Sequence, residues 1–303
     1  MQDLIVIGGG PAGISAGVYA ARKYLKTTLI TPDWGGQSNA SEGIENWIGT
    51  PKISGMALAD SLKVHLMSAK QDKVEVIEDS VEKLENVEGG FKATTKSGKE
   101  VLARAVIIAS GASRRKLDIA EADAFENKGL TYCASCDGPL FADQDVVVVG
   151  GGNAGFETAL QLLAYCKSVT LLSRSAFRAD PVSVAKAREH KNFFGIENAA
   201  PTAITGAPFV SSLSYKDASG KHELAVTGVF VEVGVMPNTN FATELLALDE
   251  VSRIKVDAKN QRTSVDGVWA AGDATDELYH QNNIAAGDGV KALEDCYLWL
   301  KMR

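Results

Sequence analysis

The sequence has little cysteine and no stretch that resembles a targeting signal. Four of its 303 residues are cysteine, and two of these, Cys166 and Cys296, stand alone. Such a set cannot form the disulfide framework of a small secreted protein, so a reducing, cytoplasmic compartment is expected. The N-terminus MQDLIVIGGG has no basic region and leads directly into an apolar run, which is not typical of a secretory signal.

Long apolar runs and blocks of positive charge are also missing. Glycine or charge interrupts every apolar run before it reaches the ~20 residues that a membrane-spanning helix needs. Lys and Arg number 31 against 38 Asp and Glu, for a formal net charge of -7. Neither a membrane nor nucleic acid is therefore an expected partner. With 45% hydrophobic and 23% charged residues, the composition is that of a globular protein long enough for two domains.

What the sequence does contain is a glycine-rich turn near its start. The run LIVIGGGPAG (residues 4–13) passes from apolar residues into glycines, and small and apolar residues then recur at helical spacing. Gly8, Gly10 and Gly13 have the G-x-G-x-x-G spacing. The first glycine permits a tight turn, the second lets the backbone approach a pyrophosphate, and the third lets the helix pack on the strand. Because the N–H groups at a helix N-terminus attract phosphates, the pattern predicts a dinucleotide site.

The same pattern occurs again in DVVVVGGGNAGFETALQLL (residues 145–163), with Gly150, Gly152 and Gly155 at the same spacing. Two such units predict two nucleotide-binding domains. A second unit that only packs well and binds nothing is the alternative.

The segments behind the two turns are also alike. Each contains short strands separated by Gly-Gly or Ser-Gly turns, followed by a buried run that ends at Gly111 in the first unit and at Gly234 in the second. Each unit is therefore expected to combine a Rossmann-type α/β core with a small antiparallel meander.

One close pair of cysteines precedes the second unit. TYCASCDGPL (residues 131–140) contains Cys133 and Cys136 in a C-x-x-C pattern, with Asp137 directly behind. Such a pair can be half of a zinc site, a redox dithiol or an accident of composition. Zinc needs four ligands, and the four histidines are scattered, so no metal site is expected. A dithiol can take up two electrons, and its second thiol can resolve the mixed disulfide that the first one forms.

Taken in order, the motifs resemble those of the low-molecular-weight thioredoxin reductase family and of its relative, the flavoprotein component of alkyl hydroperoxide reductase. The motifs are GGGPAG, GGQ, ENWIG, ASGAS, CASCD, GGGNAG and GVWAAGDATD, and they span nearly the whole chain. The resemblance implies an α/β fold of two Rossmann-like, three-layer domains, with the second inserted in the first. The FAD-binding domain would comprise residues 1–113 and 244–303. The NAD(P)-binding-like domain, residues 114–243, would carry the cysteines as a redox dithiol.

The resemblance also implies the cofactor-binding residues. Those expected at FAD are Gly8, Gly10, Pro11, Ala12, Gly13, Asp33, Gly36, Gln37, Asn46, Ala109, Ser110, Gly111, Gly272, Asp273 and Gln281. Those expected at NADPH are Gly150, Gly152, Asn153, Ala154, Gly155, Ser173, Arg174 and Arg178. Asp273 would contact the ribityl-phosphate region of FAD, although DATDELY could also begin a helix with this residue as its cap. Asp33 would meet a ribose 2′-hydroxyl, although TPDWGG also fits a plain turn.

The electron donor is the least determined feature. NADPH-using members of the family carry His-Arg-Arg followed shortly by another arginine, whereas this chain has SRSAFR, with Ser173, Arg174 and Arg178. Guanidinium groups pair well with phosphate, and no acid stands at the end of the strand to favour NADH. NADPH is therefore expected. The alternatives are ferredoxin or another donor, in which case the two arginines are only surface charges, and NADH.

These features predict a flavin-dependent thioredoxin-disulfide reductase, in which electrons pass from NADPH through FAD and the Cys133–Cys136 dithiol to a thioredoxin-like protein. Asp137 would supply or accept the proton, or else cap the helix before GPLF. The resemblance implies a homodimer whose inserted domain rotates about Ala112–Lys116 and Asn240–Thr243.

Three other functions are compatible with the same sequence. The runner-up is electron supply to a peroxidase, which would require a separate redoxin-like partner because the chain starts at the FAD strand. A non-catalytic flavin sensor would make the cysteine pair dispensable. A reductase of small disulfides would differ only in surface loops, which the sequence does not resolve.

Overall fold

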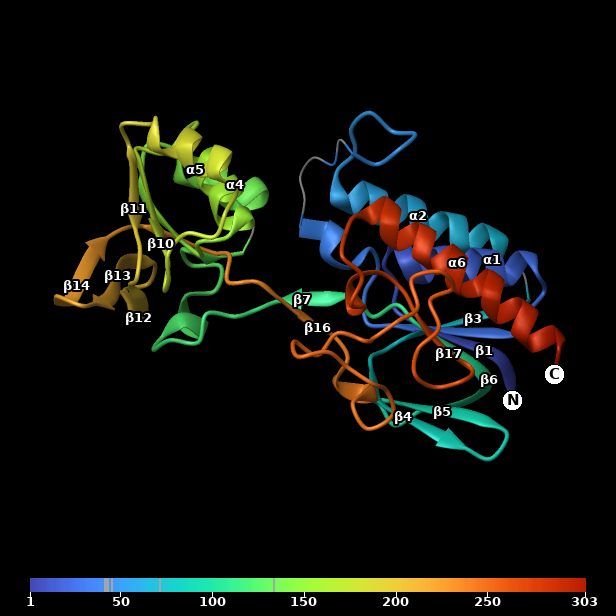
Figure 1. Ribbon diagram of the computed structural model, residues 1–303. Helices are drawn as coiled ribbons and strands as arrows, with labels where there is room; N and C mark the ends of the chain where they lie inside the picture. The colour runs from blue at the N-terminus through green and yellow to red at the C-terminus, as the bar shows by residue number, and fades with distance from the viewer. Residues whose placement is uncertain (41–43, 45, 71, 133) are drawn as a thin grey trace. The chain divides into compact units, whose positions relative to one another are not determined.

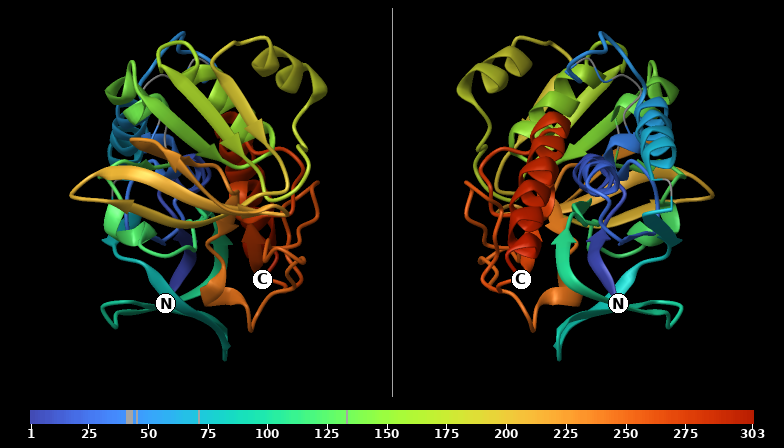
Figure 2. Two further views of the ribbon diagram at one scale, coloured as in Figure 1. Left: turned by 90° about the vertical axis from the view of Figure 1, so that its left-hand side faces the viewer. Right: turned by 90° about the vertical axis from the view of Figure 1, so that its right-hand side faces the viewer.

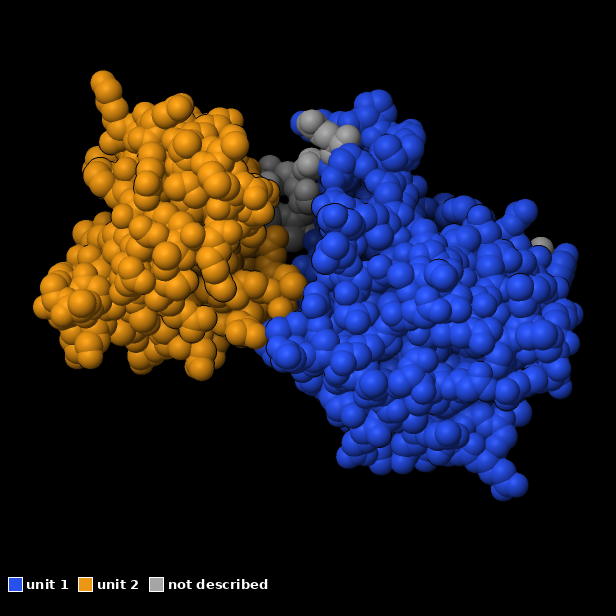
Figure 3. Space-filling view, viewed as in Figure 1, with its two compact units in different colours: residues 1–113, 236–303 blue, residues 114–235 orange. Residues whose placement is uncertain are grey.

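The computed structural model of the 303-residue chain describes all residues except 41–43, 45, 71 and 133. The chain divides into two compact units, labelled by element in Figure 1 and coloured separately in Figure 3. Unit 1 consists of residues 1–113 and 236–303, and unit 2 of residues 114–235. The second unit is thus inserted in the first.

Unit 1 is built on a seven-stranded sheet in the order β3-β2-β1-β6-β5-β4, with β17 also paired to β6. Its parallel strands are β1 (Gln2–Ile7), β2 (Thr27–Thr31), β3 (Val74–Glu78), β6 (Glu100–Ile108) and β17 (Val268–Ala270). The hairpin of β4 (Val81–Val87) and β5 (Gly90–Thr95) joins β6 in antiparallel pairing and forms the predicted meander. The helices are α1 (Pro11–Arg22), α2 (Gly55–Ala69) and α6 (Asn282–Lys301).

Both faces of this sheet are buried, which explains the unbroken apolar run of β1. Leu4 and Val6 belong to a core cluster with residues of all three helices, whereas Ile5 and Ile7 belong to a second cluster on the opposite face. Because successive side chains of a strand point to opposite faces, the two pairs alternate along β1.

Helices α1 and α6 pack directly against each other (Figures 1 and 2). A Cβ atom at Gly289 of α6 would lie 2.1 Å from the carbonyl oxygen of Ala12 in α1, so only glycine allows this approach. In the described part of the chain, no helix is both long and apolar enough to cross a membrane.

Unit 2 contains a five-stranded parallel sheet in the order β11-β10-β9-β15-β8. These strands are β8 (Leu130–Thr131), β9 (Asp145–Val149), β10 (Ser168–Leu172), β11 (Phe193–Ile196) and β15 (Gly228–Val231). A separate antiparallel sheet consists of β12 (Ala200–Gly206), β13 (Val210–Asp217) and β14 (Gly220–Ala225). The α-helices are α3 (Ala134–Asp137), α4 (Asn153–Leu162) and α5 (Pro181–Arg188).

The three layers of unit 2 follow from the alternation along β9. Val147 and Val149 pack with residues of the antiparallel sheet, whereas Val146 and Val148 pack with Phe156 of α4 and Ala187 of α5. The parallel sheet therefore lies between helices and an antiparallel layer. The predicted fold class, two Rossmann-like α/β units with one inserted in the other, is confirmed.

The chain passes between the units in two short strands, β7 (Ala112–Arg114) and β16 (Val235–Pro237), which pair with each other. The chain therefore returns to unit 1 at residue 236, whereas the sequence analysis placed this return at residue 244. The reason is that the intervening residues already belong to unit 1. Asn238 donates to the carbonyl oxygen of Ser110 (3.0 Å), and Ala242 is fully buried in the unit 1 core.

Candidate functional site

The glycine-rich turn of unit 1 has the geometry that a bound pyrophosphate requires. Gly8 has φ +121°, and a Cβ atom there would lie 2.0 Å from the carbonyl oxygen of Ala109. A Cβ atom at Gly13 would lie 1.9 Å from the carbonyl oxygen of Gly8, so helix and turn are in contact. Gly10 differs, because among the described residues, its chain neighbours apart, no atom lies within 4 Å of a Cβ atom built there. Gly10 is the N-cap of α1 and makes no side-chain cap, so the helix N-terminus faces open space.

Unit 2 repeats this geometry. Gly150 has φ +142°, and its Cβ would lie 2.1 Å from the carbonyl oxygen of Glu232. A Cβ at Gly155 would lie 1.9 Å from the carbonyl oxygen of Gly150, whereas one at Gly152 would meet no atom within 4 Å in the described part of the chain, its neighbours in sequence apart. Gly152 is the N-cap of α4, again without a side-chain cap. Both turns therefore fit a dinucleotide in the same way, and the two units have the same local construction at this point.

Several of the residues expected around FAD lie at the first turn. A Cβ at Gly36 would lie 3.8 Å from the Cα of Gly10, and one at Gly272 would lie 3.3 Å from the Cβ of Ala12. Asp33 follows β2 in an exposed loop, and its carbonyl oxygen lies 2.5 Å from a Cβ built at Gly9. The carbonyl oxygen of Asp33 accepts from Thr31 Oγ1, and its side chain is open to solvent.

Hydrogen bonds join the segments around residues 37–48 and 273–283, which are far apart in sequence. Gln37 Nε2 donates to Asp273 Oδ2 (3.2 Å), and Asn46 Nδ2 donates to Gln281 Oε1 (3.0 Å). Asn283 Nδ2 donates to the carbonyl oxygen of Asn46 (2.6 Å). Four of the predicted FAD residues are thus joined in two hydrogen-bonded pairs, Gln37 with Asp273 and Asn46 with Gln281.

Asp273 does not act as a helix cap. It lies inside a short 3-10 helix, Gly272–Ala274, and its carboxylate contacts the Gln37 side chain instead. Burial raises its pKa above the ordinary value, and the nearby His280 offsets part of that rise. The Nε2 atom of His280 is itself buried without a hydrogen-bond partner among the described residues.

The Ala109–Gly111 segment is held in place by Asn238, another residue of unit 1. Ser110 Oγ donates to the carbonyl oxygen of Asn238 (2.7 Å), so its hydroxyl is already engaged. Gly111 has φ +65° and accepts from the backbone N–H of Asn238 (2.9 Å). Ala109 is buried beneath Gly8.

Of the cysteine pair, Cys133 lies outside the described residues, and Cys136 belongs to helix α3, with its side chain outside the description as well. Asp137 ends α3, and its carboxylate accepts from Thr131 Oγ1 at the end of β8. Asp137 precedes the 3-10 helix Gly138–Phe141 without capping it, so the capping interpretation is wrong. The Thr131 hydroxyl fixes the carboxylate directly behind the C-x-x-C sequence.

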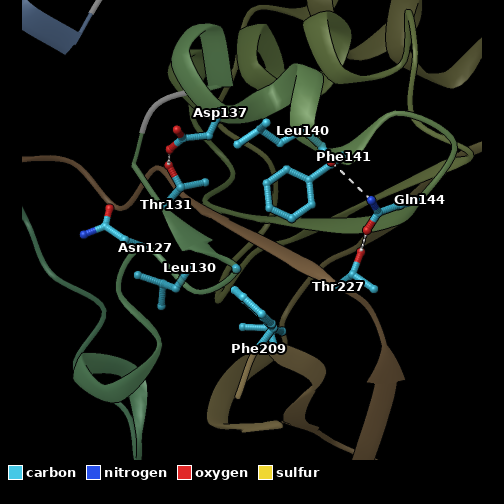
Figure 4. Close-up of a pocket in the computed structure, with 11 residues that line it drawn as sticks. Asn127, Leu130, Thr131, Asp137, Leu140, Phe141, Gln144, Phe209 and Thr227 are labelled. Atoms are coloured by element: carbon cyan, nitrogen blue, oxygen red, sulfur yellow. Dashed lines mark hydrogen bonds between the residues drawn. The ribbon is translucent and has the colours of Figure 1, made fainter. Parts of the chain in front are cut away.

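A pocket of about 450 Å³ opens beside Asp137 within unit 2 (Figure 4). Its wall combines apolar and polar groups, and the eleven lining residues are Asn127, Gly129, Leu130, Thr131, Asp137, Leu140, Phe141, Gln144, Phe209, Val210 and Thr227. Leu140 and Phe209 are 73% and 63% exposed, so the pocket continues into an apolar surface. Asp137 is the charged residue of the lining.

The loop expected to meet NADPH follows β10. Ser173 is buried, and its Oγ accepts from the backbone N–H of Ser175 (3.4 Å). Arg174 and Arg178 are exposed, and the backbone N–H of Arg178 donates to the carbonyl oxygen of Gly151 (2.8 Å). The loop therefore lies against the second glycine-rich turn and presents its two arginines to solvent.

One charged residue of this loop's surroundings escaped the sequence analysis. Glu197 follows β11, and its Oε1 accepts from the backbone N–H of Phe177 at 2.6 Å. The end of β10 itself carries no acid, since Ser173 and Arg174 follow it. Because β10 and β11 are parallel neighbours, the residues that follow them meet at the same edge of the sheet. That rule was the signal that could have found Glu197.

Comparison with known proteins places the chain in a family. The family described as pyridine nucleotide-disulphide oxidoreductase matches residues 2–289. The solved thioredoxin reductase of Lactococcus lactis is 32% identical, covers 100% of both chains and has a TM-score of 0.86. That of T. acidophilum is 33% identical, covers 98% of each chain and has a TM-score of 0.81. The F component of alkyl hydroperoxide reductase from Escherichia coli is 41% identical over 297 residues, which are 96% of this chain and 56% of that protein.

The chain belongs to the pyridine nucleotide-disulphide oxidoreductase family and is an oxidoreductase. Membership implies binding of FAD and NADPH. The open, uncapped helix N-termini at Gly10 and Gly152 fit the pyrophosphates of two such cofactors. The chain spans about half the length of the curated relatives that it matches.

Proposed function

We propose that the chain is a flavin-dependent protein-disulfide reductase that moves electrons from NADPH, through FAD and the Cys133–Cys136 dithiol, to a thioredoxin-like protein. One observation carries the proposal. Unit 2 combines an open nucleotide turn at Gly152 with the helix α3 that contains Cys136 and ends at Asp137. The end-to-end likeness to solved thioredoxin reductases supports the same function.

The residues of unit 1 would hold FAD, and those of unit 2 the nicotinamide cofactor. The N–H groups of α1 and α4 would bind the two pyrophosphates, because both helix ends are open and uncapped. Asp273, kept in place by Gln37, would accept from the ribityl or ribose hydroxyls of FAD. When bound, FAD supplies chemistry that exchanges an electron pair with both a nicotinamide and a disulfide.

The dithiol would act on the partner by exchange. One thiolate of the pair attacks the partner's disulfide and releases one partner thiol, and a mixed disulfide forms. The other thiol of the pair then attacks this bond, so that the partner leaves as a dithiol and Cys133–Cys136 becomes a disulfide. Asp137, held by Thr131, would take the proton of the attacking thiol and give it to the leaving thiolate.

The pocket beside Asp137 supports a protein partner. Its volume of about 450 Å³ suits one or two side chains, and the exposed Leu140 and Phe209 add an apolar rim. A partner that places an apolar side chain here would have its disulfide near α3, which includes Cys136.

A Cys136→Ser variant tests the proposal, because it should retain FAD and NADPH-dependent flavin bleaching but lose reduction of thioredoxin by at least about a thousandfold. Cys166→Ala is the matched control, since Cys166 is buried in the core of unit 2 and should be dispensable for turnover. Turnover of thioredoxin by the Cys136→Ser variant would refute the proposal.

Electron supply to a peroxidase is a second candidate, and the 41% identity to the F component of alkyl hydroperoxide reductase favours it. The chemistry of unit 1 and unit 2 would be unchanged, and only the partner would differ. Purified protein offered thioredoxin in one assay and a glutaredoxin-like carrier with its peroxidase in another would separate the two functions by rate.

Homodimer formation and a reducing, cytoplasmic location are part of this proposal. The buried thiols of Cys166 and Cys296 support a reducing compartment, because neither is placed for disulfide formation at the surface. Analytical ultracentrifugation of the flavin-loaded protein would measure the oligomeric state.

A further inference from the structure

The Ser173–Arg178 loop occupies the position at which a dinucleotide-binding fold discriminates between NADPH and NADH. In such folds, the residues that follow the second strand meet the adenosine ribose, and an acid there accepts from the 2′-hydroxyl whereas an arginine accommodates a 2′-phosphate. Here the loop follows β10 and is tied to the glycine-rich turn by the bond from Arg178 N–H to Gly151. Arg174 and Arg178 are exposed on it and can meet a 2′-phosphate.

The acid at this place comes from the neighbouring strand. Glu197 Oε1 accepts from the backbone N–H of Phe177 at 2.6 Å, a charge-assisted bond that holds the carboxylate against the loop. Phe177 lies between Arg174 and Arg178 in the sequence. Its other oxygen lies 4.0 Å from Arg188, and this pair is exposed, with 36% of the Glu197 side chain and 60% of the Arg188 side chain accessible. Such a contact neutralises little of the carboxylate's charge.

The loop packs on the core of unit 2 through Phe177, the residue whose backbone N–H bonds to Glu197. The ring of Phe177 packs edge-on against Phe156, at 5.0 Å between centroids, and fills the space beside Gly151 and Gly195. Phe156 is completely buried in the core of unit 2. The Glu197 carboxylate is therefore bonded to the same loop that carries the two arginines.

We infer that Glu197 is a coenzyme-specificity residue, whose carboxylate weakens binding of an adenosine 2′-phosphate relative to an adenosine 2′-hydroxyl. The inference rests on the proposed nicotinamide site of unit 2. A 2′-phosphate brings about two negative charges into the surroundings of the carboxylate, whereas a 2′-hydroxyl is neutral. The loop thus combines an attractive element, the arginines, with an opposing one, and its preference for NADPH is smaller than its arginines alone would give.

Isothermal titration of the purified flavoprotein with two matched ligands tests the inference. Adenosine 2′,5′-bisphosphate and adenosine 5′-monophosphate differ only in the 2′-phosphate, and neither needs flavin chemistry to bind. Glu197→Gln removes the charge but keeps an oxygen that can accept from Phe177 N–H. This variant should bind the bisphosphate about fivefold more tightly at low salt and the monophosphate within about twofold of the wild type.

Two controls separate charge from structure. Asp118→Asn removes the same charge from an exposed position in unit 2, in the segment before β8, and should change neither affinity. The gain of Glu197→Gln should fall below about twofold at ~0.5 M salt, because exposed charges are screened there. A role limited to holding the loop would give no such salt dependence.

Three results would overturn the inference: unchanged affinities in Glu197→Gln, a weaker affinity for the bisphosphate, or a wild-type protein that binds neither nucleotide. Loss of the disulfide reductase activity in other variants would not bear on it. Conversely, a fivefold change in nucleotide preference would stand even if the dithiol proved to serve a different partner. The two proposals can therefore fail separately.

Discussion

Replacing Gly10 by alanine should weaken FAD binding by at least about tenfold while leaving the fold intact. The backbone at Gly10 has φ -80° and ψ -175°, which alanine adopts freely and which the following Pro11 also favours. Apart from its chain neighbours, no atom of the described residues lies within 4 Å of a Cβ built there. The new methyl is therefore expected to obstruct a ligand that lies over the helix N-terminus.

The expected change in stability is smaller than the expected change in FAD affinity. At an N-cap, alanine is less favourable than glycine by about 0.5–1 kcal/mol. The less flexible unfolded chain offsets this by about 0.4–1 kcal/mol, so the apoprotein's free energy of unfolding should change by less than about 1 kcal/mol. The methyl should instead prevent one or two charge-assisted N–H bonds to the pyrophosphate. The loss of one such bond, at about 1.5–3 kcal/mol, weakens FAD binding by about 10- to 150-fold, and the loss of two weakens it further.

Two further glycine-to-alanine variants of the same protein serve as controls for Gly10→Ala. Gly152→Ala adds the same methyl to the open N-terminus of α4, so it should raise the KM for NADPH and leave FAD affinity unchanged. Gly13→Ala is the opposite case, because its Cβ would lie 1.9 Å from the carbonyl oxygen of Gly8 and must separate helix from turn. That variant should lose about 2 kcal/mol or more of stability with or without cofactor.

The assay uses apoprotein from which the flavin has been removed. Urea unfolding followed by circular dichroism measures stability, and quenching of flavin fluorescence on titration measures affinity. The reasoning is refuted if Gly10→Ala binds FAD as tightly as the wild type, since the pyrophosphate then does not lie over α1. It is also refuted if Gly10→Ala unfolds the apoprotein, since the space at Gly10 is then needed by the fold.

Three further predictions concern buried groups. Burial raises the pKa of the Cys166 thiol to about 11. Iodoacetamide at about pH 8 should therefore modify this thiol at least about a hundredfold more slowly in native protein than in urea. Peptide mass spectrometry measures the two rates, and equal rates would contradict the prediction. Burial also raises the pKa of Asp273, so its contribution to stability is lost as pH rises from below 3.8 through the folded pKa. Asp273→Asn should therefore gain stability relative to the wild type as pH rises above 3.8 in urea titrations of apoprotein, and a constant difference would be evidence against burial of the charge. Phe156→Ala removes a fully buried ring and should destabilise unit 2 by about 3–5 kcal/mol, a prediction that thermal unfolding identical to that of the wild type would contradict.

Local features of the site could be predicted from the sequence because they lie within one strand, turn and helix. Gly8, Gly10 and Gly13 belong to a span of six residues, and the three glycines have the separate geometries that the spacing predicts. The second turn was predictable for the same reason. No long-range contact had to be known in order to place either helix N-terminus.

The contacts between distant segments needed the family resemblance. Nothing in the local sequence indicates that Gln37 would bond to Asp273, or that Asn46 would bond to Gln281, across more than 230 residues. The side chain of Asp137 shows the same limit on a shorter scale. A helix cap and a bond to Thr131 are equally compatible with the sequence CDGPLF, and only the placement of β8 beside α3 decides between them.

Glu197 shows why the search for a specificity residue has to follow the edge of a sheet rather than the sequence after one strand. Ser173 and Glu197 are separated by a helix in the chain, yet each directly follows a strand, and β10 and β11 run parallel in register. Because carboxyl ends of parallel strands meet at one edge, charges that follow the two strands lie at the same edge of the sheet, where ligands of such folds bind. The arginines after β10 taken alone indicate a strong preference for NADPH. The carboxylate after β11, bonded to the same loop, implies a weaker one, and the ratio of the two nucleotide affinities in Glu197→Gln decides how much of the preference each strand supplies.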